Sequence, residues 1–202
     1  MNSPNPPFCV ALAIISLAVS ISTARAELPF SDPFTADAKV PERRALRAEW
    51  QIADGVAKCT QDDALYKKFK DHGPIIFYDL PTTDATVRYA MKPQGCKSAV
   101  FTLNSDEGHV FRFVTSERGT SIRAFPPGDE KSIETHRAAE WILKDNAWTS
   151  VAVTVEGKRV TVTFGEFPPV TVEHESYAKA RSNLSVGFAF GSMEIKDVSV
   201  TK

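Results

Sequence analysis

Neither sign of charge is in surplus in this 202-residue sequence, in which 24 Lys and Arg residues face 25 Asp and Glu residues and the net charge is -1. A protein that binds nucleic acid generally carries surplus Lys and Arg to neutralise phosphates. The sequence also holds only three cysteines, too few for a disulfide-rich miniprotein, and no CxxC pair that would indicate a zinc knuckle or a redox site. These absences argue against a nucleic-acid partner, a disulfide-rich miniprotein, a zinc knuckle and a CxxC redox site.

Motifs for familiar catalytic and metal chemistry are also absent. No HExxH pair, no Gly-x-Ser-x-Gly turn and no glycine-rich phosphate loop occurs in the sequence. The histidines are scattered without ligand spacing, at His72, His109, His136 and His174. The sequence therefore indicates no cofactor and no metal site, and a structural calcium ion cannot be read from it.

The amino-terminal segment is typical of an export signal. Residues 8–21 form an apolar run without charge, shorter than the roughly 20 residues of a membrane span. Ala24 and Ala26 then fit the small-x-small pattern of a signal-peptidase site. We predict a signal peptide over residues 1–26, no integral membrane span after cleavage, and a periplasmic, secreted or cell-surface protein. The alternative is an uncleaved amino-terminal anchor.

Two cysteines remain after removal of Cys9 with the signal peptide. An even number of cysteines in an exported chain favours a disulfide, so Cys59 and Cys96 are predicted to be bonded. The alternative is two buried thiols that never meet.

The rest of the sequence is typical of an all-β protein with two antiparallel sheets in one domain, residues 27–202. Short β-branched and aromatic runs alternate with Gly, Pro and Asp turns. Helical patterning is confined to residues 133–143 and 175–181, where one or two turns are expected. The clearest expected strands are residues 74–80, 85–91, 96–104, 109–115, 120–125, 148–156 and 158–164.

Three arginines stand alone on the less apolar side of their expected strands. Arg88, Arg112 and Arg123 each alternate with apolar neighbours. If the three strands are adjacent, three guanidiniums line one sheet face, where their planar forks suit hydroxyl-rich or carboxylate-bearing ligands. The alternative is a solvated face with ordinary Arg–Asp pairs.

Three further residues complete the candidate binding set. Asp79 is expected near the arginines, and alternation places His109 on the same side as Phe111. Trp141 is either a sugar-stacking platform or a core residue.

Several short motifs together resemble the concanavalin A-like jelly roll of secreted bacterial proteins, and in particular the 3-keto-disaccharide hydrolase-like family. They are Trp50-x-Ile52-x-Asp54-Gly55, Ala147-Trp148-Thr149, Glu156-Gly157-Lys158, and the closing segments Gly187-Phe188 and Lys196-Asp197-Val198-x-Val200. The resemblance covers residues 28–202 and implies a concanavalin A-like β-sandwich with Trp50 and Trp148 packed between its sheets.

The resemblance also implies a carbohydrate ligand. The first hypothesis is an enzyme that cleaves the glycosidic bond of a 3-keto disaccharide, whose keto group acidifies the neighbouring proton so that one base suffices. The second is a non-catalytic carbohydrate-binding or cell-surface module, and the third is an interaction domain without a sugar ligand. The same fold hosts glucanases with a Glu-x-Asp-x-x-Glu strand, but this motif is absent here.

Secreted protein is expected to begin at Glu27, because cleavage after Ala26 satisfies the signal-peptidase pattern. Amino-terminal sequencing of the exported protein checks this. A start more than a few residues away, or a retained residue 1, contradicts the predicted cleavage site.

Overall fold

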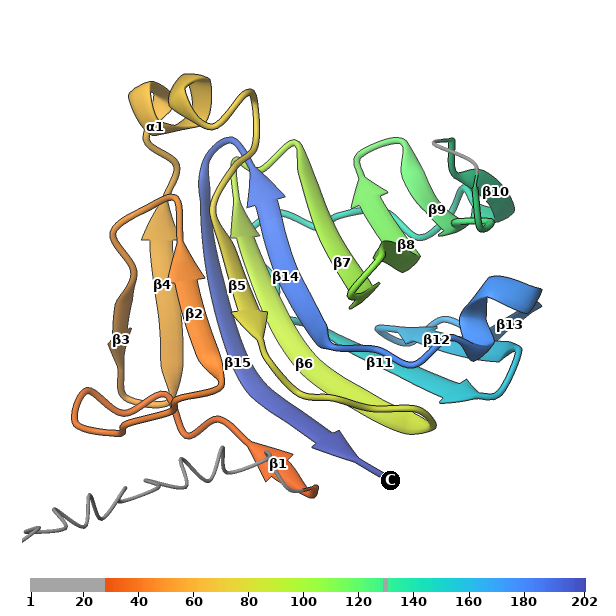
Figure 1. The fold of residues 1–202 in the computed structure, drawn as a ribbon. Helices are drawn as coiled ribbons and strands as arrows, with labels where there is room; N and C mark the ends of the chain where they lie inside the picture. The colour runs from red at the N-terminus through yellow and green to blue at the C-terminus, as the bar shows by residue number, and fades with distance from the viewer. Residues whose placement is uncertain (1–27, 129–130) are drawn as a thin grey trace, which may run out of the picture.

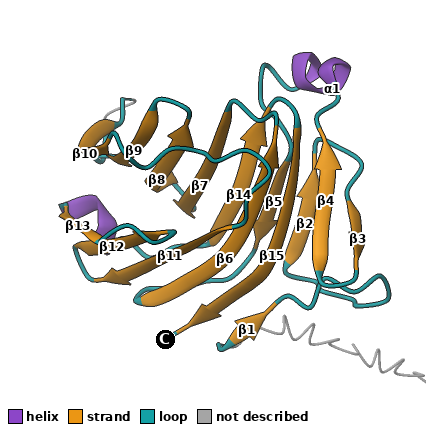
Figure 2. Ribbon diagram, turned by 180° about the vertical axis from the view of Figure 1, so that it is seen from behind, coloured by secondary structure: helices purple, strands orange, loops and turns teal. Residues whose placement is uncertain are grey.

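The structure is a computed structural model that describes residues 28–128 and 131–202. Over these residues the chain forms two antiparallel β-sheets packed face to face (Figures 1 and 2). The predicted all-β sandwich is therefore confirmed. The predicted signal peptide and its cleavage site lie outside the described residues. No helix among the described residues is long and apolar enough to span a membrane.

One sheet has eight strands. They are β1 (Phe30–Ser31), β3 (Gln51–Ala53), β4 (Val56–Thr60), β6 (Ala85–Gln94), β11 (Thr149–Glu156), β12 (Arg159–Phe164), β13 (Val170–Glu173) and β15 (Ser192–Thr201). Seven lie side by side in the order β13–β12–β11–β6–β15–β4–β3, and β1 pairs with β15.

The other sheet has seven strands. They are β2 (Arg43–Leu46), β5 (Ile75–Tyr78), β7 (Ser98–Ser105), β8 (Gly108–Ser116), β9 (Gly119–Ala124), β10 (Ile133–Ala138) and β14 (Asn183–Ala189). Their order is β10–β9–β8–β7–β14–β5–β2. Helix α1 (Asp63–Lys68) and the 3₁₀ turn η1 (Glu175–Ala178) lie in the connections.

The last two strands belong to different sheets. β14 lies between β5 and β7, while β15 lies between β4 and β6 in the facing sheet. The turn between them contains Gly191 at φ +61°, where a Cβ atom would come within 2.3 Å of the Gln94 carbonyl oxygen. Only glycine fits this crossing from one sheet to the other.

Aromatic side chains fill the space between the sheets. Phe101, Phe111 and Phe113 point inward from the seven-stranded sheet and are at most 1% exposed. Tyr89 from β6 stacks on Phe101 with ring centroids 5.7 Å apart. Burying each such ring contributes roughly 1.5–3 kcal/mol, so this layer holds the two sheets together.

Alternation along the strands follows the expected pattern in most places. Val87, Tyr89 and Met91 are buried while Arg88 is exposed, and Ile122 is buried beside an outward Arg123. The expected helical turns at residues 133–143 are wrong, because β10 occupies most of that segment and pairs with β9. Pairing at the sheet edge overrides the local helical pattern there.

Of the three tryptophans, Trp148 alone differs from expectation, and Trp141 takes the second of its two predicted alternatives. Trp141 is 1% exposed and stacks on Phe164 at 5.7 Å, so it belongs to the core and offers no platform for a sugar. Trp148 was expected in the core but is 39% exposed, because the buried Thr149 beside it takes the inward position. Lys196 Nζ lies 4.6 Å from the Trp148 ring centroid on the outer surface. Trp50 packs against the core, as expected, at the edge of Phe188.

The predicted disulfide is contradicted by the structure, in which Cys59 and Cys96 are both free thiols. The Cys96 thiol donates a hydrogen bond to the Ser192 carbonyl oxygen at 2.8 Å, so its sulfur is held against the backbone of β15. Cys59 is buried in the core, and burial raises its pKa to about 12. The Cys59 thiolate fraction is consequently very small at neutral pH.

A buried carboxylate fastens the amino-terminal segment to the sandwich. Asp32 accepts hydrogen bonds from the Tyr78 hydroxyl at 2.9 Å and from the Phe34 backbone N–H at 2.9 Å. Arg43 Nη1 contacts both Asp32 oxygens, at 2.8 and 3.1 Å. The Asp32 carboxylate is thus fully paired in the interior, as a buried charge must be.

Replacing this carboxylate is expected to cost far more stability than replacing an exposed one. Asp32→Ala leaves the Arg43 charge and the Tyr78 hydroxyl buried without their partner and should cost about 3–5 kcal/mol of unfolding free energy. Denaturant unfolding measures the loss. The control is Asp79→Ala, which breaks an ion pair with Arg44 whose side chains are 44% and 45% exposed and should cost at most about 1 kcal/mol. Equal losses in the two variants contradict this interpretation.

Candidate functional site

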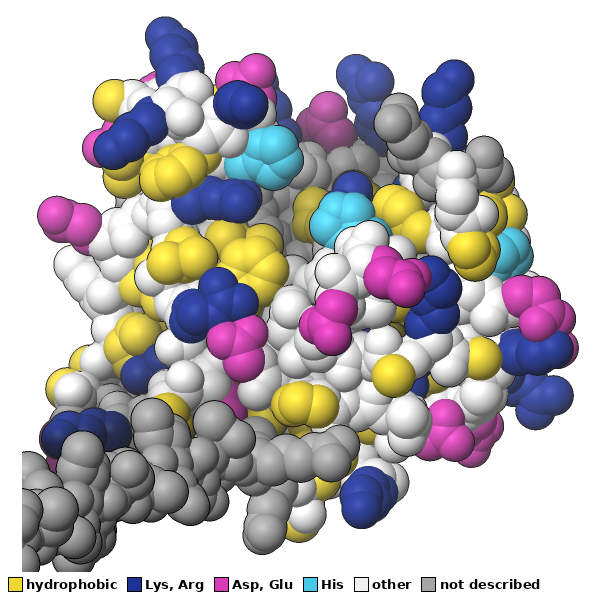
Figure 3. Space-filling view, in the orientation of Figure 1, with side chains coloured by type: hydrophobic (Ala, Val, Ile, Leu, Met, Phe, Trp, Pro, Cys, Tyr) yellow, Lys and Arg dark blue, Asp and Glu magenta, His cyan; other side chains and the backbone are white. Residues whose placement is uncertain are grey.

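A cavity of about 460 Å³ opens on the outer face of the seven-stranded sheet. Its floor is formed by β5, β14, β7 and β8, and one wall by α1 and the loop 69–74 that follows it. Figure 3 shows this face hollowed beneath α1, with His and Lys or Arg side chains around the hollow. The volume falls within the range of small-ligand pockets.

The core decides which side chains form the floor. Phe101 and Leu103 of β7 and Phe113 of β8 point inward, so the residues alternating with them point outward. The outward polar set that lines the cavity is Ser98, Thr102, Asn104, Arg112 and Ser185.

The wall is built by a short capped helix and a tight loop. Asp62 caps α1 by accepting hydrogen bonds from the backbone N–H groups of Ala64 and Leu65, which places Tyr66 at the cavity. The loop then passes through Asp71 at φ +61° and lies directly on β14. A Cβ atom at Gly73 would be 2.1 Å from the Phe188 carbonyl oxygen, so only glycine permits this close approach.

A β-bulge brings His109 onto the cavity face. Leu103 pairs with Phe111 and Asn104 pairs with His109, so one extra residue lies in β8. Val110 and Phe111 are both buried, and His109 is turned outward beside Arg112. The expectation that His109 shares the side of Phe111 is therefore wrong, because a bulge reverses the alternation.

A chain of hydrogen bonds crosses three strands at the cavity floor. Arg112 Nη2 lies 2.6 Å from His109 Nε2, and His109 Nδ1 lies 2.6 Å from Asn104 Oδ1. Asn104 Nδ2 donates to Asn183 Oδ1 at 2.8 Å. A guanidinium only donates, so Arg112 sets the direction: His109 accepts at Nε2, donates from Nδ1 and is neutral.

The electrostatics agree with this neutral histidine. Burial, followed by the nearby charges of Arg112 and His72, lowers the pKa of His109 to about 4. Burial and the charge of Arg123 also lower the pKa of Arg112 from its usual value, though a guanidinium remains charged at any physiological pH. The cavity floor therefore holds one permanent cation supported by a neutral imidazole.

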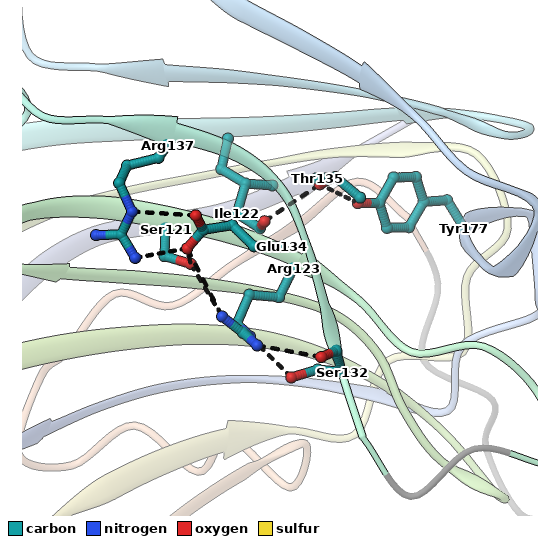
Figure 4. Close-up of polar contacts among 8 residues, drawn as sticks. All are labelled: Ser121, Ile122, Arg123, Ser132, Glu134, Thr135, Arg137 and Tyr177. Atoms are coloured by element: carbon teal, nitrogen blue, oxygen red, sulfur yellow. Dashed lines mark hydrogen bonds and ion pairs between the residues drawn. The ribbon is translucent and has the colours of Figure 1, made fainter.

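Arg112 and Arg123 are direct partners across β8 and β9 but have different surroundings. Arg123 Nε donates to the Ser132 hydroxyl at 2.7 Å, and Arg123 Nη1 lies 3.7 Å from the Glu134 carboxylate. Figure 4 shows these contacts. Glu134 also pairs with Arg137 at 2.6 Å. Arg112 instead contacts His109, the Thr102 hydroxyl at 3.4 Å and the face of the Phe125 ring. Within the described residues, no carboxylate forms an ion pair with Arg112.

The predicted arginine row is correct for two of its three members. Arg112 and Arg123 share the outer face of the seven-stranded sheet, but Arg88 lies in β6 of the other sheet and points to the opposite side of the molecule. The prediction for Arg88 was wrong because it assumed that its strand is adjacent to those of Arg112 and Arg123. The chain instead crosses from one sheet to the other between β6 and β7. Asp79 is bound by Arg44 through two hydrogen bonds of 2.6 and 2.7 Å, beyond the residues that line the cavity.

Several cavity residues were not found from the sequence. Arg47, Tyr66, Asp71, His72 and Asn104 come from loops, a helix and a strand that carry no motif. These segments are far apart in the sequence and meet at the cavity only because the chain folds them around β14. Among residues 28–128 and 131–202, no group of three or more His, Cys, Asp or Glu side chains could hold a metal ion.

The sequence matches no protein-family model and no curated protein. Solved structures nevertheless share the architecture. A carbohydrate-binding module from Bacillus subtilis matches with a TM-score of 0.59 and 10% identity over 80% of this chain and 96% of that one. The β-glucanase of Bacillus licheniformis matches at 0.64 and 9% identity, covering 86% and 98% of the two chains.

A homodimeric agglutinin from chicken liver matches at a TM-score of 0.53 and 12% identity, over 63% of this chain and 99% of that one. The chain has a concanavalin A-like jelly-roll fold. Identities this low show the shared fold and leave function to the chemistry of the site.

The pKa of His109 is expected to rise when Arg112 is replaced. Arg112→Ala removes a nearby positive charge and the donor that occupies Nε2, both of which favour the neutral imidazole. NMR titration of the His109 ring should show protonation near pH 4 in the unaltered protein and at a higher pH in the variant. Arg88→Ala, on the opposite face, should leave the titration unchanged. An unchanged pKa in Arg112→Ala contradicts the hydrogen-bond chain.

Proposed function

We propose that the chain binds a carbohydrate in the cavity on the outer face of the seven-stranded sheet. The main observation is the polar floor of that cavity, where Arg112 and the hydroxyls of Thr102 and Ser185 lie beside one another. Sugars present many hydroxyls, which suit fixed donors and acceptors of this kind. The likeness to a carbohydrate-binding module and a glucanase supports the proposal at the level of fold.

Aromatic and apolar groups at the same cavity fit the less polar faces of a sugar ring. Tyr66 from α1 and Phe77 from β5 line it, together with Ile75 and Val100. A carbohydrate site combines a few placed polar groups with such flat surfaces.

Cleavage of a 3-keto disaccharide, as the family resemblance implies, is the second candidate. Of the residues that line the cavity, Asp71 alone carries a carboxylate, so the two-carboxylate route of glycosidases lacks its second group there. An elimination needs a single base, which the neutral imidazole of His72 supplies: its Nδ1 donates to the Lys70 carbonyl oxygen at 2.8 Å, so in the neutral ring Nε2 is the acceptor. Export to the periplasm, the cell surface or the medium belongs to the same proposal, on the basis of the predicted signal peptide.

Filling the cavity is expected to weaken sugar binding strongly. Val100 lies on the outward side of β7 at the cavity floor, so Val100→Trp occupies the space without removing a polar group. Glycan-array binding followed by calorimetry should show an affinity loss of at least about tenfold, since the blocked contacts are worth more than 1.4 kcal/mol. The matched control, Ala152→Trp, adds the same ring to the outward side of β11 in the other sheet and should bind normally.

Two outcomes decide between the candidates. Release of product from a 3-keto-glucoside by the unaltered protein favours cleavage, whereas binding without turnover favours a binding module. No binding to any glycan contradicts the proposed function and leaves an interaction domain.

A further inference from the structure

The charges at the cavity are mainly positive. Its lining contains the guanidiniums of Arg47 and Arg112 against the single carboxylate of Asp71, and the neutral His109 adds no charge. Resting on the proposed function, we propose that the cavity selects saccharides that carry a carboxylate, the uronates, and that Arg112 binds this carboxylate. This proposal restricts the carbohydrate ligand of the cavity to sugars that carry a carboxylate.

Arg112 has hydrogen-bonding capacity left over. A guanidinium carries five N–H donors. One from Nε points to Thr102 and one from Nη2 to His109, which leaves three without a partner among the described residues. Nη1 and Nη2 together form the planar fork that binds a carboxylate with two parallel hydrogen bonds.

The position of Arg112 also calls for a negative charge. Its side chain is half-buried and faces the like charge of Arg123, its direct partner across β8 and β9. Arg123 is offset by Glu134, but none of the ion pairs among the described residues includes Arg112. A bound carboxylate supplies the missing charge, while a neutral sugar leaves the repulsion in place.

The neighbours of Arg112 hold it ready for this contact. The neutral His109 accepts from Nη2 and is itself fixed through Asn104 and Asn183, so the guanidinium is oriented without an acidic partner that would compete with the ligand. The Phe125 ring lies 5.3 Å from Arg112 Cζ and supports the guanidinium. Hydroxyls of Thr102 and Ser185 nearby match the hydroxyls of a sugar rather than a bare carboxylate.

The test compares saccharides that differ only in charge. Calorimetry is run with oligosaccharides of galacturonate, glucuronate, mannuronate and guluronate, each beside its carboxyl-reduced counterpart, in which every carboxylate is a neutral CH₂OH group. A neutral oligosaccharide bearing sulfate forms a third arm. We expect at least one uronate to bind roughly 10–100-fold more tightly than its reduced form, the range for a charged hydrogen bond. Added salt should weaken the uronate complex.

Matched variants assign the preference to Arg112. Arg112→Gln keeps a hydrogen-bond donor but loses the charge, so the ratio between uronate and reduced sugar should fall toward one. Arg88→Gln, the same change on the opposite sheet, should preserve the ratio. Unchanged thermal unfolding of both variants shows that the fold is intact.

The outcomes separate this inference from the function on which it rests. Equal or tighter binding of the reduced sugars overturns the uronate preference and leaves carbohydrate binding standing. Preference for the sulfated sugar over every uronate also overturns it, as does a ratio that survives Arg112→Gln. Failure of all sugars, charged and neutral, overturns both.

Discussion

The packing of phenylalanine rings between the two sheets is the constraint from which the site follows. Phe101 of β7 and Phe111 and Phe113 of β8 are buried between the sheets, so the residues that alternate with them point outward. Arg112, between Phe111 and Phe113, is therefore on the outer face. Alternation in β8 is interrupted by the bulge at Val110 and Phe111, which buries both residues. This single extra residue moves His109 from the core side to the cavity. The core thereby determines both the position of the guanidinium and the position of the imidazole that orients it.

The two adjacent arginines show how surroundings decide what a side chain can do. Arg123 and Arg112 occupy the same row of the same sheet, yet Arg123 is tied to Ser132 and Glu134 at the sheet edge. Arg112 lies one strand further in, where its polar neighbours are uncharged. The Arg123 guanidinium is paired within the protein, whereas Arg112 keeps N–H donors at the cavity. Two half-buried arginines in one row therefore differ in the hydrogen bonds and charges that they can offer a ligand.

Much of the fold could be predicted from local patterns, because alternating apolar residues and turn residues report directly on strands. The outward positions of Arg112 and Arg123 followed from that alternation. Strand order did not follow, because pairing between distant segments leaves no local signal, and so Arg88 was assigned to the wrong sheet. The bulge at His109 and the loop carrying Asp71 and His72 depend on tertiary packing, which local sequence does not encode.

The placement of β14 and β15 has a consequence for how the protein is made. These two strands follow all the other described strands in the sequence, yet each occupies an interior position of its sheet. Until they are synthesised, β5 and β7 in one sheet and β4 and β6 in the other have unpaired edges, which invite pairing with other chains. Both sheets can therefore close only once β14 and β15 have been synthesised, by long-range contacts that form slowly. A nascent chain of this protein is exposed to aggregation throughout that interval and benefits from being held unfolded until residues 183–201 are available.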